Sequence, residues 1–130
     1  MKTLIVDDDY SCRRILQAYL LKHGACDLAS NGSEAIDKFK AALIDKEPYD
    51  LICLDIMMPE IDGHEVLQTI RKIEENEGIY GSDNVKIIMT TALSDTENIV
   101  KSFKEQSEAY IIKPIEDEKL VKTLKYLELI

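Results

Sequence analysis

The sequence predicts an α/β fold in which helices cover both faces of a parallel β-sheet. Short apolar runs rich in β-branched residues alternate with segments of helical periodicity from one end of the chain to the other. Residues 51–54, Leu-Ile-Cys-Leu, are apolar at every position, as expected for a strand covered on both faces. A βα pattern repeated five times favours a parallel sheet with helical crossovers, without a second domain.

Five strands are expected from the apolar runs, and the second has the weakest pattern. They cover Thr3–Val6, Cys26–Ala29, residues 49–54, residues 85–90 and Ala109–Ile112. A polar stretch at residues 74–84 precedes the fourth strand and contains Gly78 and Gly81. We interpret this stretch as a surface loop.

Five helices are expected from apolar side chains that recur with helical spacing. Their stripes are Ile15, Leu16, Tyr19 and Leu20; Ile36, Phe39 and Leu43; Val66, Leu67, Ile70 and Ile73; Ile99, Val100 and Phe103; and Leu120, Val121, Leu124 and Leu127. Asp9 is expected to be a cap or a solvated acid at the first helix, and Ser33 is expected to cap the second helix. Ser94 with Glu97 has the spacing of a capping box for the fourth.

Composition limits the classes of function. The chain has 130 residues, and 16 Lys and Arg against 25 Asp and Glu give a net charge of −9. This length suits one domain, residues 1–130, and the acidic balance argues against direct nucleic-acid binding. Three cysteines without CxxC spacing disfavour a disulfide scaffold. The same cysteine pattern favours a reducing cytoplasm. No apolar run approaches the ~20 residues that span a bilayer, which argues against membrane insertion.

Polar side chains follow the expected strands at the points where these end. Three aspartates, Asp7, Asp8 and Asp9, follow the first strand, and Asp55 follows the third. Thr90 and Thr91 lie at the end of the fourth strand, and Lys113 and Pro114 follow the fifth. Sites of α/β sheets form beyond the carboxyl ends of the strands. Clustered carboxylates repel one another unless a cation lies between them, and oxygen ligands favour Mg²⁺. With a lysine and a hydroxyl nearby, such a cluster can support phosphoryl transfer to a carboxylate.

These residues resemble the receiver domain of two-component response regulators along essentially the whole chain. The resemblance rests on four motifs in order: Val6-Asp7-Asp8, residues 54–59 (Leu-Asp-Ile-Met-Met-Pro) with Asp62-Gly63, Thr91-Ala92, and Lys113-Pro114. It implies a flavodoxin-like (βα)5 fold, a doubly wound parallel five-stranded sheet with strand order 2-1-3-4-5.

The resemblance also implies roles for the acidic residues. Asp55 matches the aspartate that accepts a phosphoryl group from a histidine kinase. Asp8 matches the acid that binds Mg²⁺ directly, and Asp7 matches the acid that acts mainly through water. Asp55 and the backbone carbonyl of Met57 would complete the protein ligands of the metal.

Three further residues match the switching part of the family. Lys113 matches the lysine that pairs with the acceptor carboxylate and then with a phosphoryl oxygen, and its bond to Pro114 is cis in the family. Thr91 matches the hydroxyl that turns toward the phosphoryl group; we choose it over Thr90 because it precedes Ala92. Tyr110 matches the aromatic residue that reports the conformation.

The implied function is a phospho-accepting switch in a phosphorelay. The expected partners are a histidine kinase or phosphotransfer protein and an unknown output protein. The chain is expected to be no enzyme beyond its own phosphorylation and dephosphorylation. Its start at Met1 favours a stand-alone protein over one cut from a longer regulator, and both stay open.

A phosphatase and a flavin-binding module are the alternatives to a phospho-accepting switch. A Mg²⁺-dependent phosphatase with an aspartyl-phosphate commonly has a second acid two residues after the nucleophile, where this chain has Met57. A flavin-binding module would need a Ser-, Thr- or Gly-rich phosphate loop after the first strand, where three aspartates would repel a phosphate.

The resemblance also bears on the lifetime of the phosphoryl group. Met57 and Leu93 match the two positions of the family that flank the path of the hydrolytic water. Both side chains are apolar and cannot orient that water, which predicts a long-lived phosphoryl group.

Overall fold

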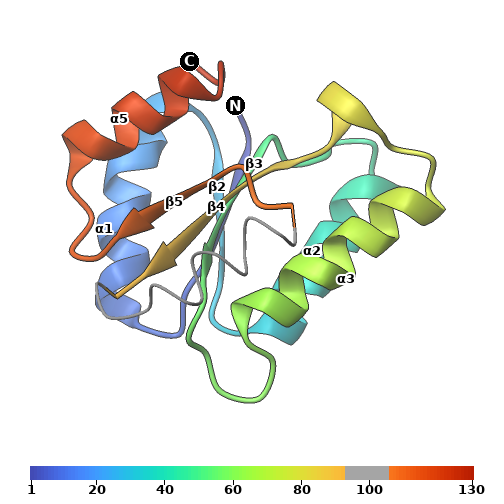
Figure 1. Ribbon diagram of the computed structural model, residues 1–130, viewed down its shortest axis with the longest axis horizontal. Helices are drawn as coiled ribbons and strands as arrows, with labels where there is room; N and C mark the ends of the chain where they lie inside the picture. The colour runs from blue at the N-terminus through green and yellow to red at the C-terminus, as the bar shows by residue number, and fades with distance from the viewer. Residues whose placement is uncertain (93–105) are drawn as a thin grey trace.

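A computed structural model of the chain describes residues 1–92 and 106–130. Strands and helices alternate through these residues (Figure 1). The elements are β1 (Thr3–Val6), α1 (Tyr10–Leu20), a 3₁₀ turn (Leu21–His23), β2 (Cys26–Ala29), α2 (Gly32–Ile44), β3 (Leu51–Asp55), α3 (Gly63–Asn76), a second 3₁₀ turn (Gly81–Asp83), β4 (Lys86–Thr91), β5 (Ala109–Ile112) and α5 (Asp117–Tyr126).

The five strands form one parallel sheet with the order β2-β1-β3-β4-β5, so the implied strand order is confirmed. Because all strands run the same way, their carboxyl ends meet at one edge. β1 and β3 lie side by side in the middle, which brings the residues that follow them together. This is the edge at which sites of doubly wound sheets form.

Helices cover both faces of the sheet, with α1 and α5 on one side and α2 and α3 on the other (Figure 1). Each face therefore has its own apolar core, as the alternation of side chains along a strand requires. The core under α1 and α5 contains Ile5, Cys53, Ile88 and Ile111, and the core under α2 and α3 contains Leu4, Ile52, Leu54, Ile87 and Met89. Burial on both faces explains why these strands are apolar at nearly every position.

The helix caps were predicted in part. Asp9 caps α1, where its carboxylate accepts hydrogen bonds from the backbone N–H groups of Ser11 and Cys12. The prediction that Ser33 caps α2 is wrong, because Asn31 is the cap and accepts from the Glu34 N–H at 2.8 Å. Asparagine and serine are both good N-caps, and the helix begins two residues earlier than expected.

The boundaries of three other elements differ from the predictions. β3 covers Leu51–Asp55 and not residues 49–54, and the Tyr49 hydroxyl ahead of it donates to the Asp27 carboxylate at 2.6 Å. β4 covers Lys86–Thr91, shifted by one residue. The polar stretch 74–84 begins within a helix, since α3 continues to Asn76.

Two expectations lie outside the described residues. They are the fourth helix, with its stripe at Ile99, Val100 and Phe103, and its capping box at Ser94 and Glu97. Within the part of the chain that the structure describes, no helix combines the length and the apolar character needed to cross a membrane.

Candidate functional site

Three carboxylates meet at the carboxyl edge of the sheet. Asp7 and Asp8 follow β1, Asp55 ends β3, and ligand oxygens of the three lie within 4.8 Å of one another. Asp7 and Asp55 are 0% and 4% exposed, whereas Asp8 is exposed. The cluster therefore has a buried base and one carboxylate at the surface, which leaves access for a small ion or a phosphoryl donor.

Lys113 brings a positive charge to this cluster from the end of β5. Its Nζ lies 2.9 Å from Asp7 Oδ2 and 3.3 Å from Asp55 Oδ1. The Lys113 N–H donates to the Thr91 carbonyl at 2.7 Å, which ties the end of β5 to the end of β4. The peptide bond between Lys113 and Pro114 is cis, as the resemblance implied.

The electrostatics of the site leave the Asp55 carboxylate poorly compensated. Burial first, and then the negative charge of Asp7, raise the pKa of Asp55 to about 7, although Lys113 opposes this shift. Burial lowers the pKa of Lys113, but its hydrogen bond to Asp7 and the charge of Asp55 outweigh burial, so the net shift is upward. The lysine is therefore protonated at neutral pH, while Asp55 is only partly ionised in the absence of a cation.

Backbone contacts fix the acids in place. Asp7 Oδ1 accepts from the Asp9 N–H at 2.9 Å, and Asp55 Oδ1 accepts from the Met57 N–H at 3.3 Å. Gly63 begins α3 so close to β3 that a Cβ there would lie 2.4 Å from the Asp55 carbonyl oxygen. This close approach gives the Asp62-Gly63 motif a physical reason.

Arg13 is a residue of this site that sequence reasoning missed. Its Nη1 donates to the Asp7 main-chain carbonyl at 2.7 Å and so holds the turn between β1 and α1. An arginine on an amphipathic helix normally lies on the solvated face. Nothing in the residues around Arg13 therefore predicted its contact with the turn that follows β1.

The structure brings Asp7, Asp8, Asp55 and Lys113 together at the carboxyl edge of the sheet. The roles expected of Thr91, Tyr110 and the Met57 carbonyl stay predictions. The Thr91 hydroxyl donates to the neighbouring Ala92 carbonyl at 3.3 Å, and its strand position puts it on the face covered by α2 and α3. The aromatic residue Tyr110 is 39% exposed on β5.

The Met57 side chain is 61% exposed, so it does not enter the acid cluster. Its N–H is the group that bonds to Asp55. Leu93, the other residue expected beside the path of a hydrolytic water, lies outside the described residues.

The donor set fits a divalent cation. If all three carboxylates ionise, the one ammonium of Lys113 leaves two negative charges uncompensated, and a divalent cation would balance them. Oxygen ligands from carboxylates favour Mg²⁺ or a similar hard ion, which keeps several of its waters. The exposed Asp8 provides the side from which a hydrated ion can enter.

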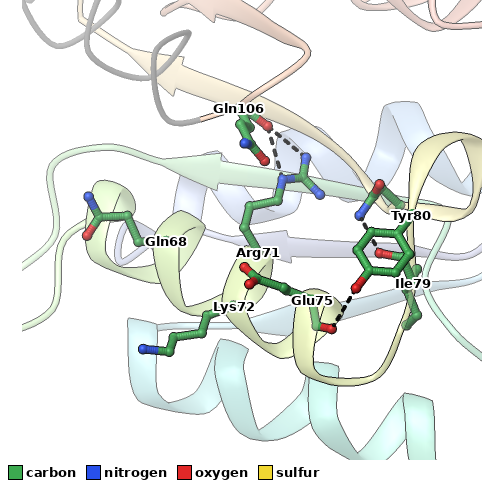
Figure 2. Close-up of a pocket in the computed structure, with 8 residues that line it drawn as sticks. Gln68, Arg71, Lys72, Glu75, Ile79, Tyr80 and Gln106 are labelled. Carbon is green, nitrogen blue, oxygen red and sulfur yellow. Dashed lines mark hydrogen bonds between the residues drawn. The ribbon is translucent and has the colours of Figure 1, made fainter.

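A polar cavity of about 610 Å³ lies beside α3, away from the acid cluster (Figure 2). Arg71 lines it, but its guanidinium is already engaged: Nε and Nη2 donate to the Gln106 carbonyl at 3.1 and 2.8 Å. Nη1 lies 2.6 Å from Glu74, and Nη2 lies 2.8 Å from Glu108. Ile79, Tyr80 and Asn84 line another wall of the cavity. We therefore interpret Arg71 as a structural tie between α3 and the start of β5.

Comparison with known proteins identifies the family. The family model described as "Response regulator receiver domain" matches residues 3–125. The chain is 39% identical over 127 residues to the transcriptional regulatory protein ResD of Bacillus subtilis, covering 97% of this chain and 47% of ResD. It is 32% identical over 124 residues to the regulatory protein VanRB of Enterococcus faecalis, covering 95% of this chain and 50% of VanRB. The chain thus spans about half the length of these curated relatives.

Solved structures show the same fold. The receiver domain of the histidine kinase CKI1 from Arabidopsis thaliana, complexed with Mg²⁺ and BeF₃⁻, superimposes with a TM-score of 0.85 at 25% identity, covering 98% of this chain and 89% of that chain. The receiver domain of Ssk1 from Saccharomyces cerevisiae, crystallised with the phosphotransfer protein Ypd1, gives a TM-score of 0.82 at 28% identity, covering 96% and 86%. The predicted flavodoxin-like fold with a parallel five-stranded sheet is therefore confirmed.

Proposed function

Because the chain belongs to the response regulator receiver family, we propose that residues 1–130 form a single phospho-accepting switch with Asp55 as the acceptor. The observation that carries this proposal is the contact between Lys113 and Asp55 inside the acid cluster at the end of β3. A buried carboxylate beside a lysine and two further acids is suited to receive a phosphoryl group and to respond to the new charge.

The chemical step is a transfer between two side chains. An Asp55 oxygen attacks the phosphorus of a phosphohistidine on the donor protein, and a P–O bond forms as the P–N bond breaks. The electron pair of the broken bond stays on the imidazole nitrogen. Lys113, held 3.3 Å from Asp55, can follow the negative charge onto the transferred group.

A divalent cation fits the acid cluster. We propose that Asp8 and Asp55 bind Mg²⁺ through their side chains, that Met57 contributes its carbonyl, and that Asp7 acts mainly through water. When bound, the ion would neutralise charge on the carboxylates and on phosphoryl oxygens. A Zn²⁺ site with nitrogen or sulfur ligands is disfavoured, because the described cluster consists of oxygen donors.

Switching would use the residues around the edge of β4 and β5. We propose that the Thr91 hydroxyl leaves its contact with the Ala92 carbonyl and turns toward the phosphoryl group, and that Tyr110 changes its exposure in response. The driving force is a change of charge at one buried carboxylate, which biases two conformations of the same fold.

The partners follow from this chemistry. A histidine kinase or a phosphotransfer protein would donate the phosphoryl group; the Ssk1 receiver, a structural neighbour, was crystallised with such a protein. We propose an output protein as the second partner, a cytoplasmic location and no direct contact with nucleic acid, in line with the net charge of −9. Met57 occupies the position, two residues after Asp55, at which Mg²⁺-dependent phosphatases with an aspartyl-phosphate commonly have a general acid. A methionine there favours a switch over an enzyme that turns over other substrates.

The proposal is tested by treating the protein with acetyl phosphate and measuring its intact mass. One phosphoryl group should be added in Mg²⁺ buffer and none after chelation with EDTA. The Asp55→Asn variant should stay unlabelled, while the Asp37→Asn variant, altered at an exposed acid of α2, should label like the native protein. Equal labelling of Asp55→Asn would refute the assignment of the acceptor.

A further inference from the structure

We propose that Thr90 supplies a second hydroxyl to this site and donates a hydrogen bond to the phosphorylated side chain of Asp55. The inference rests on the proposed function and names a group that the resemblance did not assign. Thr90 is 1% exposed and lies in β4, immediately before Thr91.

The strand register places Thr90 beside the acceptor. Asp55 pairs with Thr90 across β3 and β4, and Thr90 pairs with Ile111 across β4 and β5. Paired residues of neighbouring strands project from the same face of a sheet, with the strands ~4.8 Å apart. Since Ile111 belongs to the core under α1 and α5, Asp55 and Thr90 project to that face together.

Lys113 passes over this position. It follows β5, yet its Nζ contacts Asp55 at the end of β3 and Asp7 beyond β1. In the sheet order, β4 lies between β5 and β3, so the lysine stem must cross the end of β4 where Thr90 lies. We infer from this crossing that the lysine stem helps to cover the Thr90 hydroxyl, which is buried near the edge of the sheet.

The Thr90 hydroxyl has no hydrogen-bond partner among the described residues, although its Oγ1 is buried. A buried unpaired hydroxyl lowers the free energy of unfolding, and valine would fill the same space without that cost. A threonine here is explained if the hydroxyl finds its acceptor in the other state of the switch.

Phosphorylation would provide that acceptor. The modified Asp55 carries new phosphoryl oxygens with a greater negative charge, and Lys113, drawn to one of them, would uncover the Thr90 hydroxyl. Thr90 would then donate a hydrogen bond to the phosphoryl group from the side of the sheet that α1 and α5 cover. Thr91 would approach the same group from the side that α2 and α3 cover. The two adjacent threonines thus have separate tasks.

The test measures binding of beryllium fluoride, which stands in for the phosphoryl group, by calorimetry in Mg²⁺ buffer. The Thr90→Val variant should bind it about tenfold more weakly, the loss of one hydrogen bond of about 1.4 kcal/mol. The same variant should unfold at a higher urea concentration when beryllium fluoride is absent. Thr90→Ser, which keeps the hydroxyl, should bind within about twofold of the native protein.

Thr3 provides a matched control. It is 1% exposed on β1, its Oγ1 is likewise buried without a partner among the described residues, and it lies at the opposite end of the sheet. Thr3→Val should therefore raise stability without changing the affinity for beryllium fluoride.

The outcomes separate the two proposals. Native affinity in Thr90→Val, or an equal loss in Thr3→Val, would overturn the role of Thr90 while the switch itself stands. If the native protein neither binds beryllium fluoride nor becomes labelled at Asp55, the proposed function falls, and the role of Thr90 falls with it.

Discussion

Replacing Asp55 by asparagine should stabilise the protein in metal-free buffer at pH 8, even though it removes the proposed acceptor. The substitution is nearly isosteric and deletes one negative charge from a cluster of three carboxylates. Burial and the charge of Asp7 raise the pKa of Asp55 from 3.8 to about 7. The ionised side chain is thus less favourable in the folded protein than in the unfolded chain.

The size and pH range of the effect follow from this shift. At ~1.36 kcal/mol per pKa unit the full shift would correspond to roughly 4 kcal/mol of free energy of unfolding. Because water at the edge of the site screens the charges, we expect Asp55→Asn to gain only about 1–2 kcal/mol over the native protein. The folded state binds more protons than the unfolded state between pH 3.8 and about 7. The native protein therefore loses stability as the pH rises through this range, and Asp55→Asn should lose less.

Urea unfolding followed by circular dichroism measures the difference. In EDTA the variant should be more stable than the native protein at pH 8, and the difference should vanish near pH 4. Mg²⁺ should narrow the gap at pH 8, because it binds the native cluster more tightly. The Asp37→Asn control should change little. A less stable Asp55→Asn protein at pH 8 without metal would refute the view that repulsion and burial govern this site.

Three further predictions concern single residues. Asp8→Ala should abolish Mg²⁺-dependent labelling by acetyl phosphate while the circular dichroism spectrum is preserved; an unchanged Mg²⁺ affinity by titration would show that the ligands are misassigned. Met57→Asn should shorten the lifetime of the phosphorylated protein about tenfold, because the amide can orient the attacking water, and equal decay would exclude control by this position. Arg71→Gln should lower the free energy of unfolding by about 3–5 kcal/mol, because it leaves the carboxylate of Glu74 buried without its cation; a midpoint of urea unfolding equal to that of the native protein would contradict this.

Much of the fold and the site could be predicted because their signals are local. β1, β2 and β5 have the predicted bounds; β1 and β5 are short apolar runs with clear ends, whereas β2 contains the exposed Asp27 and has the weakest pattern. Asp7 and Asp55 could be placed together because residues that follow parallel strands meet at one edge. Lys113 joined them for the same reason.

The features that were missed depend on contacts between distant residues. Glu74 lies in a polar stretch, yet it is buried because Arg71 pairs with it and the Val85 N–H donates to it at 2.7 Å. The choice of Asn31 over Ser33 as the cap of α2 depends on where the backbone turns into the helix. The isolation of the Thr90 hydroxyl could be recognised only after its surroundings were known.

The central claim is that Asp55 carries the phosphoryl group, and borohydride trapping tests it most directly. Borohydride reduces an acyl phosphate to an alcohol and leaves a free carboxylate unchanged, so the phosphorylated aspartate becomes homoserine. After phosphorylation in Mg²⁺ buffer, reduction and proteolysis, peptide sequencing by mass spectrometry should find homoserine at position 55 alone, and none in the sample treated with EDTA. Homoserine at position 7 or 8, or an unreduced residue at position 55 in fully phosphorylated protein, would contradict the account.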